Sequence, residues 1–282
     1  MKNQVITRKA SIALQILRDA GVSGLLAHVR RKAYLWRECY AARRVKSVTI
    51  DGCIFTLEAI PNNAMKVSLL KGKYERFERH AVLRYLRPEY PVIELGGCIG
   101  VVACVTNCAL KVPKAHVVVE INPNIISVLR KNRDINQCEF EILNQAIAYD
   151  QPSVTFSPSS DFRGTSLRQN VNRSFETPLV TVATTTLGSI VTQRGYDRFN
   201  LICDIEGNEY ELVQREPHML DRVDTLILET HARLIGEARH SEMMKKLADL
   251  GFRIIDQDSF VVVMRQDSSS QQTTKEHEHS HE

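Results

Sequence analysis

Five apolar runs in the sequence end in polar side chains that could take part in a reaction. These side chains are Glu94, Glu120, Asn144, Asp204 with Glu206, and Glu229 with His231. Open α/β sheets bind ligands outside the carboxyl ends of their strands, so we expect these groups to meet at one rim of a sheet. Repeated placement of acids at one rim favours an enzyme over a set of unrelated strand caps.

Asp204, Glu206 and His231 are the candidate catalytic residues. Either carboxylate could remove a proton from an acceptor or orient it, and an imidazole has a pKa suited to a general base. Structural roles are also open, because Asp204 could cap its own loop and His231 could be held by Glu229 or by a backbone carbonyl. The sequence further leaves open a divalent metal held by Asp204, Glu206 and His231.

Residues 92–123 have the pattern of a β-α-β unit: an apolar run, a glycine-rich loop, a buried helix and a second apolar run. The loop contains Gly96, Gly97 and Gly100, and the second run ends at Glu120. Glycines let the backbone approach a ligand at a helix N-terminus, and an acid after the second strand can reach a ribose diol. The unit therefore predicts a nucleotide-binding site.

The spacing of the loop distinguishes between cofactors. A dinucleotide fingerprint needs Gly-x-Gly-x-x-Gly, but Leu95 stands where its first glycine would be. Glu94, Gly96 and Gly100 form Glu-x-Gly-x-x-x-Gly, which resembles the loop of class I S-adenosylmethionine methyltransferases. In that class the loop packs against the methionine end of the cofactor and the next acid holds the ribose. NAD is the minor alternative.

The remaining pattern predicts the fold class: an α/β, class I methyltransferase Rossmann-like doubly wound sheet, mostly parallel, with a C-terminal antiparallel hairpin. We expect strands over residues 92–94, 117–119, 140–148, 199–203, 225–228, 252–255 and 260–264. We expect helices over residues 73–87, 101–110, 124–136, 209–220 and 242–250.

Residues 1–69 are predicted to form a basic helical and hairpin extension ahead of a methyltransferase domain at 70–266. The extension begins with helices that break near Gly21 and ends in a hairpin with Asp51-Gly52 as its turn.

Two further segments depart from the α/β alternation. Residues 151–186 read as an insertion at the ligand-facing edge, suited to a substrate loop, and Ser166 within it is a candidate cofactor contact. Residues 267–282 contain no apolar side chain, so we expect a disordered tail. Its Glu/His run could chelate a transition metal, but a solvated tail is the preferred interpretation, outside any active site.

Charge is distributed unevenly along the chain. Residues 1–90 hold 18 Lys and Arg against 7 Asp and Glu, whereas the remainder is net acidic. A basic front half suggests an anionic partner, and its amphipathic stretch with Trp36 could lie on an anionic membrane surface. A helix that caps the domain with a solvated basic face is the simpler interpretation. The few aromatic residues in this region are too sparse to form a stacking platform for bases, which disfavours nucleic acid as the partner.

Bulk properties favour a globular protein of the cytoplasm. The 282 residues are 43% hydrophobic, enough for a sizeable core, and no apolar run is long enough to cross a bilayer. The start of the sequence lacks the pattern of a signal peptide. Seven cysteines without a Cys-x-x-Cys pair predict reduced thiols in the cytoplasm, with contact at the inner membrane face as an added expectation. Oligomeric state and acceptor are left open.

Several motifs together resemble the FkbM family of methyltransferases over about residues 70–265. They lie at residues 74–75, 94–100, 120–123, 185–188, 202–209 and 229–231. The resemblance implies S-adenosylmethionine as cofactor and O-methylation of a hydroxyl on a sugar or glycan, a glycolipid or a secondary metabolite. The cofactor-binding residues that motifs and strand ends suggest are Tyr74, Glu75, Glu94, Gly96, Gly97, Cys98, Gly100, Glu120 and Asn144, with Ser166 from the insertion.

The sequence departs from the family pattern at two positions. Cys98 replaces an Asn of the glycine loop, and Ile202 stands where the family has Lys before Ile-Asp-x-Glu-Gly. If that Lys assists catalysis, the protein is slower, acts differently or is inactive. The alternatives are therefore N-methylation of an amine or protein side chain, and a cofactor-binding scaffold without turnover.

Overall fold

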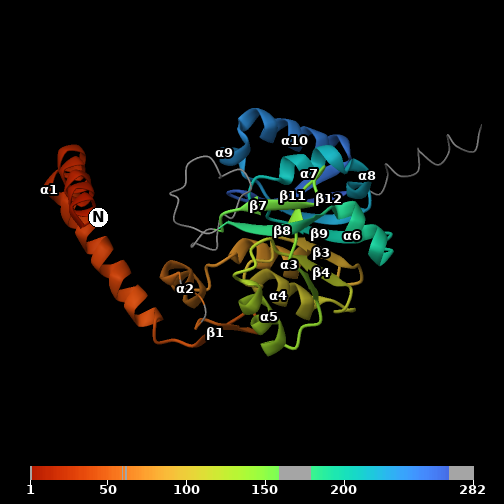
Figure 1. Cartoon of the computed structure of the whole chain (residues 1–282), viewed down its shortest axis with the longest axis horizontal. Coiled ribbons are helices and arrows are strands. Elements are labelled where there is room, and N and C mark those ends of the chain that lie inside the picture. The colour runs from red at the N-terminus through yellow and green to blue at the C-terminus, as the bar shows by residue number, and fades with distance from the viewer. Residues whose placement is uncertain (1, 59, 61, 159–178, 267–282) are drawn as a thin grey trace, which may run out of the picture.

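The structure is a computed structural model that describes residues 2–58, 60, 62–158 and 179–266 (Figure 1). For residues 2–10, 12–14, 16, 31–32 and 34–36 it describes the backbone alone. Ser166 and the tail at 267–282 lie outside the described residues, so the predictions made for them stay predictions.

A seven-stranded sheet forms the centre of the molecule, in the order β11-β12-β10-β9-β3-β4-β5. Its strands are β3 Val92–Leu95, β4 His116–Val119, β5 Glu141–Leu143, β9 Phe199–Cys203, β10 Val223–Glu229, β11 Phe252–Asp258 and β12 Val261–Gln266. Strands β3, β4, β5, β9 and β10 pair in parallel, and β12 pairs antiparallel with β10 and β11. The predicted fold class, with its C-terminal hairpin, is confirmed.

Helices cover both faces of this sheet (Figure 1). One face carries α6 Leu187–Arg194, α7 Glu209–Arg215, α8 Pro217–Leu220 and α10 Glu237–Asp249, and the other carries α3 Arg76–Tyr85, α4 Val101–Ala109 and α5 Ile126–Ile135. Successive strand residues point to opposite faces, so Ile93 and Leu95 enter one core while Val92 enters the other. The strands are therefore apolar on both faces and held rigidly, which is suited to positioning side chains at their ends.

Helix α1, Lys2–Ala42, extends away from the sheet and breaks at Gly21, whose φ of 63° and ψ of −168° are not helical (Figure 1). Strands β1 Ser47–Ile50 and β2 Cys53–Thr56 then form the predicted hairpin. Its turn residues Asp51 and Gly52 have φ of 47° and 84°, as an Asp-Gly hairpin turn requires. Among the described residues, no helix combines the length and the apolar character that crossing a bilayer requires.

The hairpin is docked onto α5 by two asparagines. Asn132 Oδ1 accepts from the amide of Thr56 at 2.9 Å, and Asn136 Oδ1 accepts from the amide of Ile54 at 2.7 Å. Buried residues of the hairpin also share an apolar core with α4 and α5. Residues 47–56 thus brace the helices behind the glycine loop, and the boundary placed at residue 69 stays a prediction.

The single strand predicted over residues 140–148 is wrong. Strand β5 ends at Leu143, and Ala146–Ile147 forms a separate strand, β6, that joins β7 Ser153–Phe156 and β8 Val180–Thr185 in a small second sheet. The break occurs at Asn144, whose amide donates to the carbonyls of Glu120 and Ile121 at 2.7 and 3.1 Å. These side-chain bonds turn the chain away from β4.

Helices α2 Asn63–Leu70, α6 and α9 Ala232–Ile235 were not predicted, and the first two begin at a side-chain cap. Helix α2 follows Asn62, whose Oδ1 accepts from the amides of residues 64 and 65. Helix α6 follows Thr186, whose hydroxyl accepts from the amide of Ser189. Helix 209–220 is divided by Pro217 into α7 and α8, because proline cannot continue the hydrogen bonding of the first helix. The short helix α9 leads into α10.

Candidate functional site

The described residues form a cavity of about 640 Å³ at the carboxyl ends of β3, β4, β9 and β10. The strand order reverses between β3 and β9, and this switch point is where open α/β sheets bind ligands. The volume falls within the range of small-molecule sites, roughly 300–1,000 Å³. Acidic side chains outnumber the basic Lys73 and Arg76 in its lining: Glu75, Glu78, Glu120, Asp204, Glu206, Glu229 and Asp258.

The glycine loop is packed too tightly for larger residues. Gly96 has a φ of 96°, and a Cβ atom on it would lie 1.8 Å from the carbonyl oxygen of Asp204. A Cβ on Gly97 would lie 2.3 Å from a methyl group of Val118. The glycines therefore serve first to seat the loop against β9 and β4, and the edge of the loop at Gly96 and Cys98 then faces the cavity.

Glu120 ties the loop to the end of β4. Its Oε2 accepts from the amide of Cys98 at 2.8 Å, and its Oε1 accepts from the amide of Asn122 at 2.6 Å. Burial raises the pKa of Glu120 to about 7, although both hydrogen bonds favour the charged form. The carboxylate also lines the cavity, where its remaining lone pairs can accept from a ligand; contact with a ribose diol stays a prediction.

Tyr74 and Glu75 join the loop from the start of α3. The hydroxyl of buried Tyr74 donates to the sulfur of Cys98 at 3.2 Å, so the residue that replaces the family asparagine is held by a hydrogen bond. Glu75 caps α3 in a left-handed conformation with a φ of 45°, and it lines the cavity. Burial, followed by the charge of Glu78, raises the pKa of Glu75 well above its usual range.

Four predicted cofactor residues do not line the cavity that the described residues form: Glu94, Gly97, Gly100 and Asn144. Glu94 lies buried beneath the loop, 3.5 Å from Nε2 of His116, and burial raises its pKa to about 8. Asn144 holds the chain after β4, and its neighbour Gln145 lines the cavity in its place. The side chains of Glu94 and Asn144 therefore support the site from behind.

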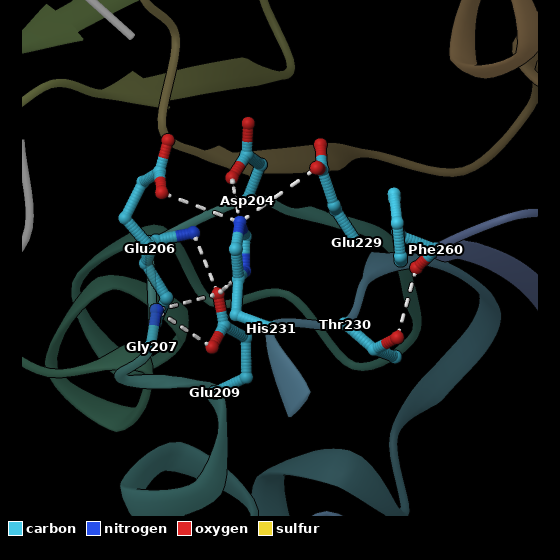
Figure 2. A network of polar contacts seen from close by, with 9 residues as sticks. Asp204, Glu206, Gly207, Glu209, Glu229, Thr230, His231 and Phe260 are labelled. Atoms are coloured by element: carbon cyan, nitrogen blue, oxygen red, sulfur yellow. Dashed lines mark hydrogen bonds and ion pairs between the residues drawn. The ribbon is translucent and has the colours of Figure 1, made fainter. Parts of the chain in front are cut away.

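The structure brings the three predicted catalytic residues together around the ring of His231 (Figure 2). Nε2 of His231 lies 3.3 Å from Oε2 of Glu206 and 3.7 Å from Oδ1 of Asp204. Oε1 of Glu229 is also 3.7 Å from Nε2. Asp204 and Glu206 line the cavity, whereas His231 lies behind them.

Glu209 is the functional residue that sequence reasoning missed. Its Oε1 lies 2.9 Å from Nδ1 of His231, so Glu209, rather than Glu229 or a backbone carbonyl, holds the ring (Figure 2). Glu209 is fully buried at the start of α7 and also accepts from the amides of Ile205 and Gly207. Glu209 is the last residue of the motif at 202–209, and this position in the sequence could have indicated that it belongs to the site.

Opposed electrostatic effects act on Asp204 and His231. Burial raises the pKa of Asp204 well above its usual range, and the charges of Glu229 and Glu206 raise it further. Burial alone would lower the pKa of His231, but the hydrogen bond and charge of Glu209, with the charges of Glu206 and Glu229, raise it. Among the described residues, Oδ1 of Asp204 is a buried oxygen without a hydrogen-bond partner. Such perturbed groups in a cavity are typical of catalytic sites.

The same cluster has the donor set of a metal site. Asp204, Glu209 and His231 offer ligand atoms within 4.8 Å of one another, the only such group of three or more in the part of the chain that the structure describes. The predicted set named Glu206 in place of Glu209. Because Glu209 already accepts from two backbone amides and faces the ring of His231, the structure accounts for it without an ion.

This fold and site define the class of protein. A parallel sheet with a glycine loop after its first strand, an acid after its second and further carboxylates at the switch point is a class I methyltransferase domain. The chain belongs to the FkbM methyltransferase family, since the family model described as Methyltransferase FkbM domain matches residues 94–254. Its cofactor is S-adenosylmethionine, and the carboxylate of Glu120 in the cavity fits that cofactor's ribose.

Solved structures with similar folds include other methyltransferases. The ribosomal protein L11 methylase from Lactobacillus delbrueckii subsp. bulgaricus is 10% identical, with a TM-score of 0.39, and the match covers 70% of this chain and 80% of that one. A putative SAM-dependent methyltransferase from Streptococcus mutans is 7% identical, with a TM-score of 0.46, and the match covers 77% and 54%. A search of curated proteins finds no match.

Replacing Glu120 with alanine is expected to weaken cofactor binding. The loss of a charge-assisted hydrogen bond costs about 1–3 kcal/mol, or about 5- to 150-fold in Kd. Calorimetric titration with S-adenosylmethionine measures the change. Glu120→Gln keeps one acceptor oxygen and should lose less, and unchanged affinity in Glu120→Ala would show that the ribose is held elsewhere.

Proposed function

We propose that this protein transfers a methyl group from S-adenosylmethionine to a hydroxyl of a sugar or glycan, a glycolipid or a secondary metabolite. Asp204 is the group that takes the hydroxyl proton. The carrying observation is that Asp204 lines the cavity while its Oδ1, buried 3.7 Å from Nε2 of His231, has no hydrogen-bond partner among the described residues. A carboxylate with a raised pKa is matched to this task near neutral pH.

Glu120, Gly96, Cys98 and Gln145 are the groups that would hold the cofactor, because they line the same cavity from the ends of β3, β4 and β5. When bound, S-adenosylmethionine supplies an electrophilic methyl group on a sulfonium. The acidic wall favours a cationic ligand there and excludes anionic competitors. The protein's remaining work is to place the acceptor oxygen and remove its proton.

His231 and Glu209 act as positioning residues behind the wall. Glu209 accepts a hydrogen bond from Nδ1 of His231, and this bond directs Nε2 toward Glu206 and Asp204. A ring held in this way keeps the carboxylates in place, and in its protonated form it offsets their mutual repulsion. These groups titrate as one coupled set.

Hydroxyl-rich acceptors fit the wall because carboxylates accept hydrogen bonds from hydroxyl groups. The same excess of acids supports N-methylation of a cationic amine as the second candidate. A cofactor-binding scaffold without turnover is less well supported. The lysine of the family pattern, whose loss would be the reason for inactivity, would stand at the position of Ile202. The Ile202 side chain belongs to the core cluster of Val92 and Val102 and does not line the main cavity, although it lines a small pocket next to Asp204 and Glu229.

The test is a screen with methyl-labelled S-adenosylmethionine against sugars, glycolipids, secondary metabolites and amines. Products are analysed before and after mild alkaline treatment, which cleaves an ester but leaves an ether or an amine intact. Alkali-stable methylation of a hydroxyl acceptor supports the proposal, whereas transfer to amines alone supports the second candidate. Activity lost to a chelator and restored by Mg²⁺ would reassign Asp204, Glu209 and His231 to a metal.

Glu229→Gln is expected to shift the acid limb of the kcat/KM profile toward lower pH. Asp204 must be deprotonated to act, so the rate rises with pH through its raised pKa. Glu229 is the charged neighbour that raises this pKa most, so its neutralisation lowers the pKa. The rate above the limb should change by less than about tenfold. Asp258→Asn, also in the cavity wall, is the matched control and should leave the limb in place; an unmoved limb in Glu229→Gln contradicts the assignment.

We also propose that the protein is cytoplasmic and makes peripheral contact with an anionic membrane surface through its basic N-terminal region. Support comes from the 18 basic residues among residues 1–90 and from the exposed Val22, Leu26 and Val29 of α1. Flotation with anionic vesicles tests this. Binding that is lost in neutral vesicles supports the proposal, and absence of binding to both removes it.

A further inference from the structure

Four cysteines from three separate segments meet beside the docked hairpin. Cys53 belongs to β2, Cys104 and Cys108 to α4, and Cys138 follows α5. The sulfur of Cys108 lies 3.7 Å from that of Cys53 and 3.9 Å from that of Cys138. The cofactor cavity includes none of these four residues in its lining, so the cluster is a second site.

The thiols of the cluster differ in reactivity. Hydrogen bonds from Cys104 and Cys108, with the charge of Arg133, lower the pKa of Cys138 against the effect of burial. Burial raises the pKa of Cys53 and of Cys108. Cys138 is only partly buried and Cys108 is exposed, so a small oxidant can reach this pair. A thiol of lowered pKa beside an accessible thiol is the arrangement of redox-reactive cysteines.

We propose that Cys138 and Cys108 form a dithiol that hydroperoxides oxidise to a reversible disulfide. The thiolate of Cys138 attacks the terminal oxygen of the peroxide: a sulfur–oxygen bond forms, the oxygen–oxygen bond breaks, and an alcohol, or water from hydrogen peroxide, leaves after protonation. Cys108 then attacks the sulfenic sulfur: a sulfur–sulfur bond forms, the sulfur–oxygen bond breaks, and the hydroxyl leaves as water with the proton of Cys108. The two thiols lose two electrons in total, and the peroxide gains them.

A disulfide fits the arrangement better than a thiolate metal centre. In the described part of the chain, no three cysteines have sulfur atoms within 4.8 Å of one another, so the sulfurs form a row and not a tetrahedral cage. The bond would join the end of α4 to the segment after α5. Because it closes a loop of about 30 residues in the unfolded chain, the oxidised protein should have a higher Tm.

The experiment treats the full chain with hydrogen peroxide, blocks free thiols by alkylation and maps tryptic peptides by mass spectrometry. We expect the peptide 85–111 to be joined to 134–163 and to separate after reduction. Cys108→Ser should lose the cross-link and leave a sulfenic acid on Cys138 that dimedone captures. Cys138→Ser should lose both products, whereas Cys39→Ser, in α1, should behave like the wild type.

Cys98 and Cys104 share a peptide with Cys108, so Cys98→Ser and Cys104→Ser separate the three. A cross-link that persists in both of these variants and disappears in Cys108→Ser supports the proposal. A cross-link that persists in Cys108→Ser overturns the assignment of Cys108. If the peptide 85–111 is joined to 47–66, which carries Cys53, and not to 134–163, the assignment of Cys138 is overturned. If the wild type forms no cross-link at all, the proposed dithiol site is overturned.

Discussion

Asp204→Asn is expected to lower kcat for methyl transfer by about 10²- to 10⁴-fold, the usual contribution of a general base. This corresponds to about 3–5 kcal/mol of transition-state stabilisation. The amide has nearly the same shape but cannot accept the hydroxyl proton. The backbone amide of residue 204, which donates to the carbonyl of Leu95 at 2.8 Å, is untouched, so the loop should keep its place.

Affinity for S-adenosylmethionine in this variant should stay within about tenfold, or 1.4 kcal/mol. Calorimetric titration measures it beside the rate, using the acceptor found in the screen. Asp258→Asn makes the same substitution elsewhere in the cavity wall and should keep most of the activity. If Asp204→Asn instead loses cofactor binding, Asp204 is a cofactor ligand and the base must be sought at Glu206.

Gly96→Ala is expected to destabilise the protein by about 2–5 kcal/mol, from overpacking together with the left-handed backbone. The new methyl group would lie 1.8 Å from the carbonyl oxygen and 2.8 Å from the carbonyl carbon of Asp204. Backbone atoms cannot rotate away as a flexible side chain can, so β3 and β9 must separate at their ends. Cofactor affinity should fall at least about tenfold, because the loop and Glu120 move with them.

Urea unfolding and calorimetric titration measure these two effects. Gly195→Ala is the matched control, because Gly195 is also left-handed, with a φ of 64° and a ψ of 33°, but has no atom within 4 Å of the added Cβ. It should lose only about 1–2 kcal/mol, the cost of the backbone conformation. Equal effects of the two substitutions would show that the contact with Asp204 relaxes at little cost.

Asp204 and Gly96 occupy one junction. The carbonyl of Asp204 abuts the glycine loop, while its carboxylate lines the cavity beside Glu206. The backbone contact thus couples the part of the site that holds the cofactor to the part that removes the proton. A change at either residue should therefore be read in both assays.

Much of the fold could be predicted because local patterns carry it. Short apolar runs, each followed by a polar side chain, predicted the parallel strands, and Asp51-Gly52 predicted the hairpin turn. The strand predicted over residues 140–148 was wrong because a tertiary hydrogen bond from Asn144 divides a run that is locally uniform. Helices α2 and α6 were missed because each is only eight residues long and lacks a clear apolar stripe.

By itself the sequence determined the class of fold, the glycine loop and which acids meet at one rim, because residue spacing along a strand or helix decides these features. Only the tertiary structure decided which groups touch. It placed Glu209 under His231, Glu94 beneath the loop and Cys53 beside Cys108, because these contacts join segments whose separation in sequence carries no signal of their distance in space. Sequence spacing does not encode how helices and strands pack against one another. That packing brings the acids at the ends of the strands into contact with one another and with the cavity.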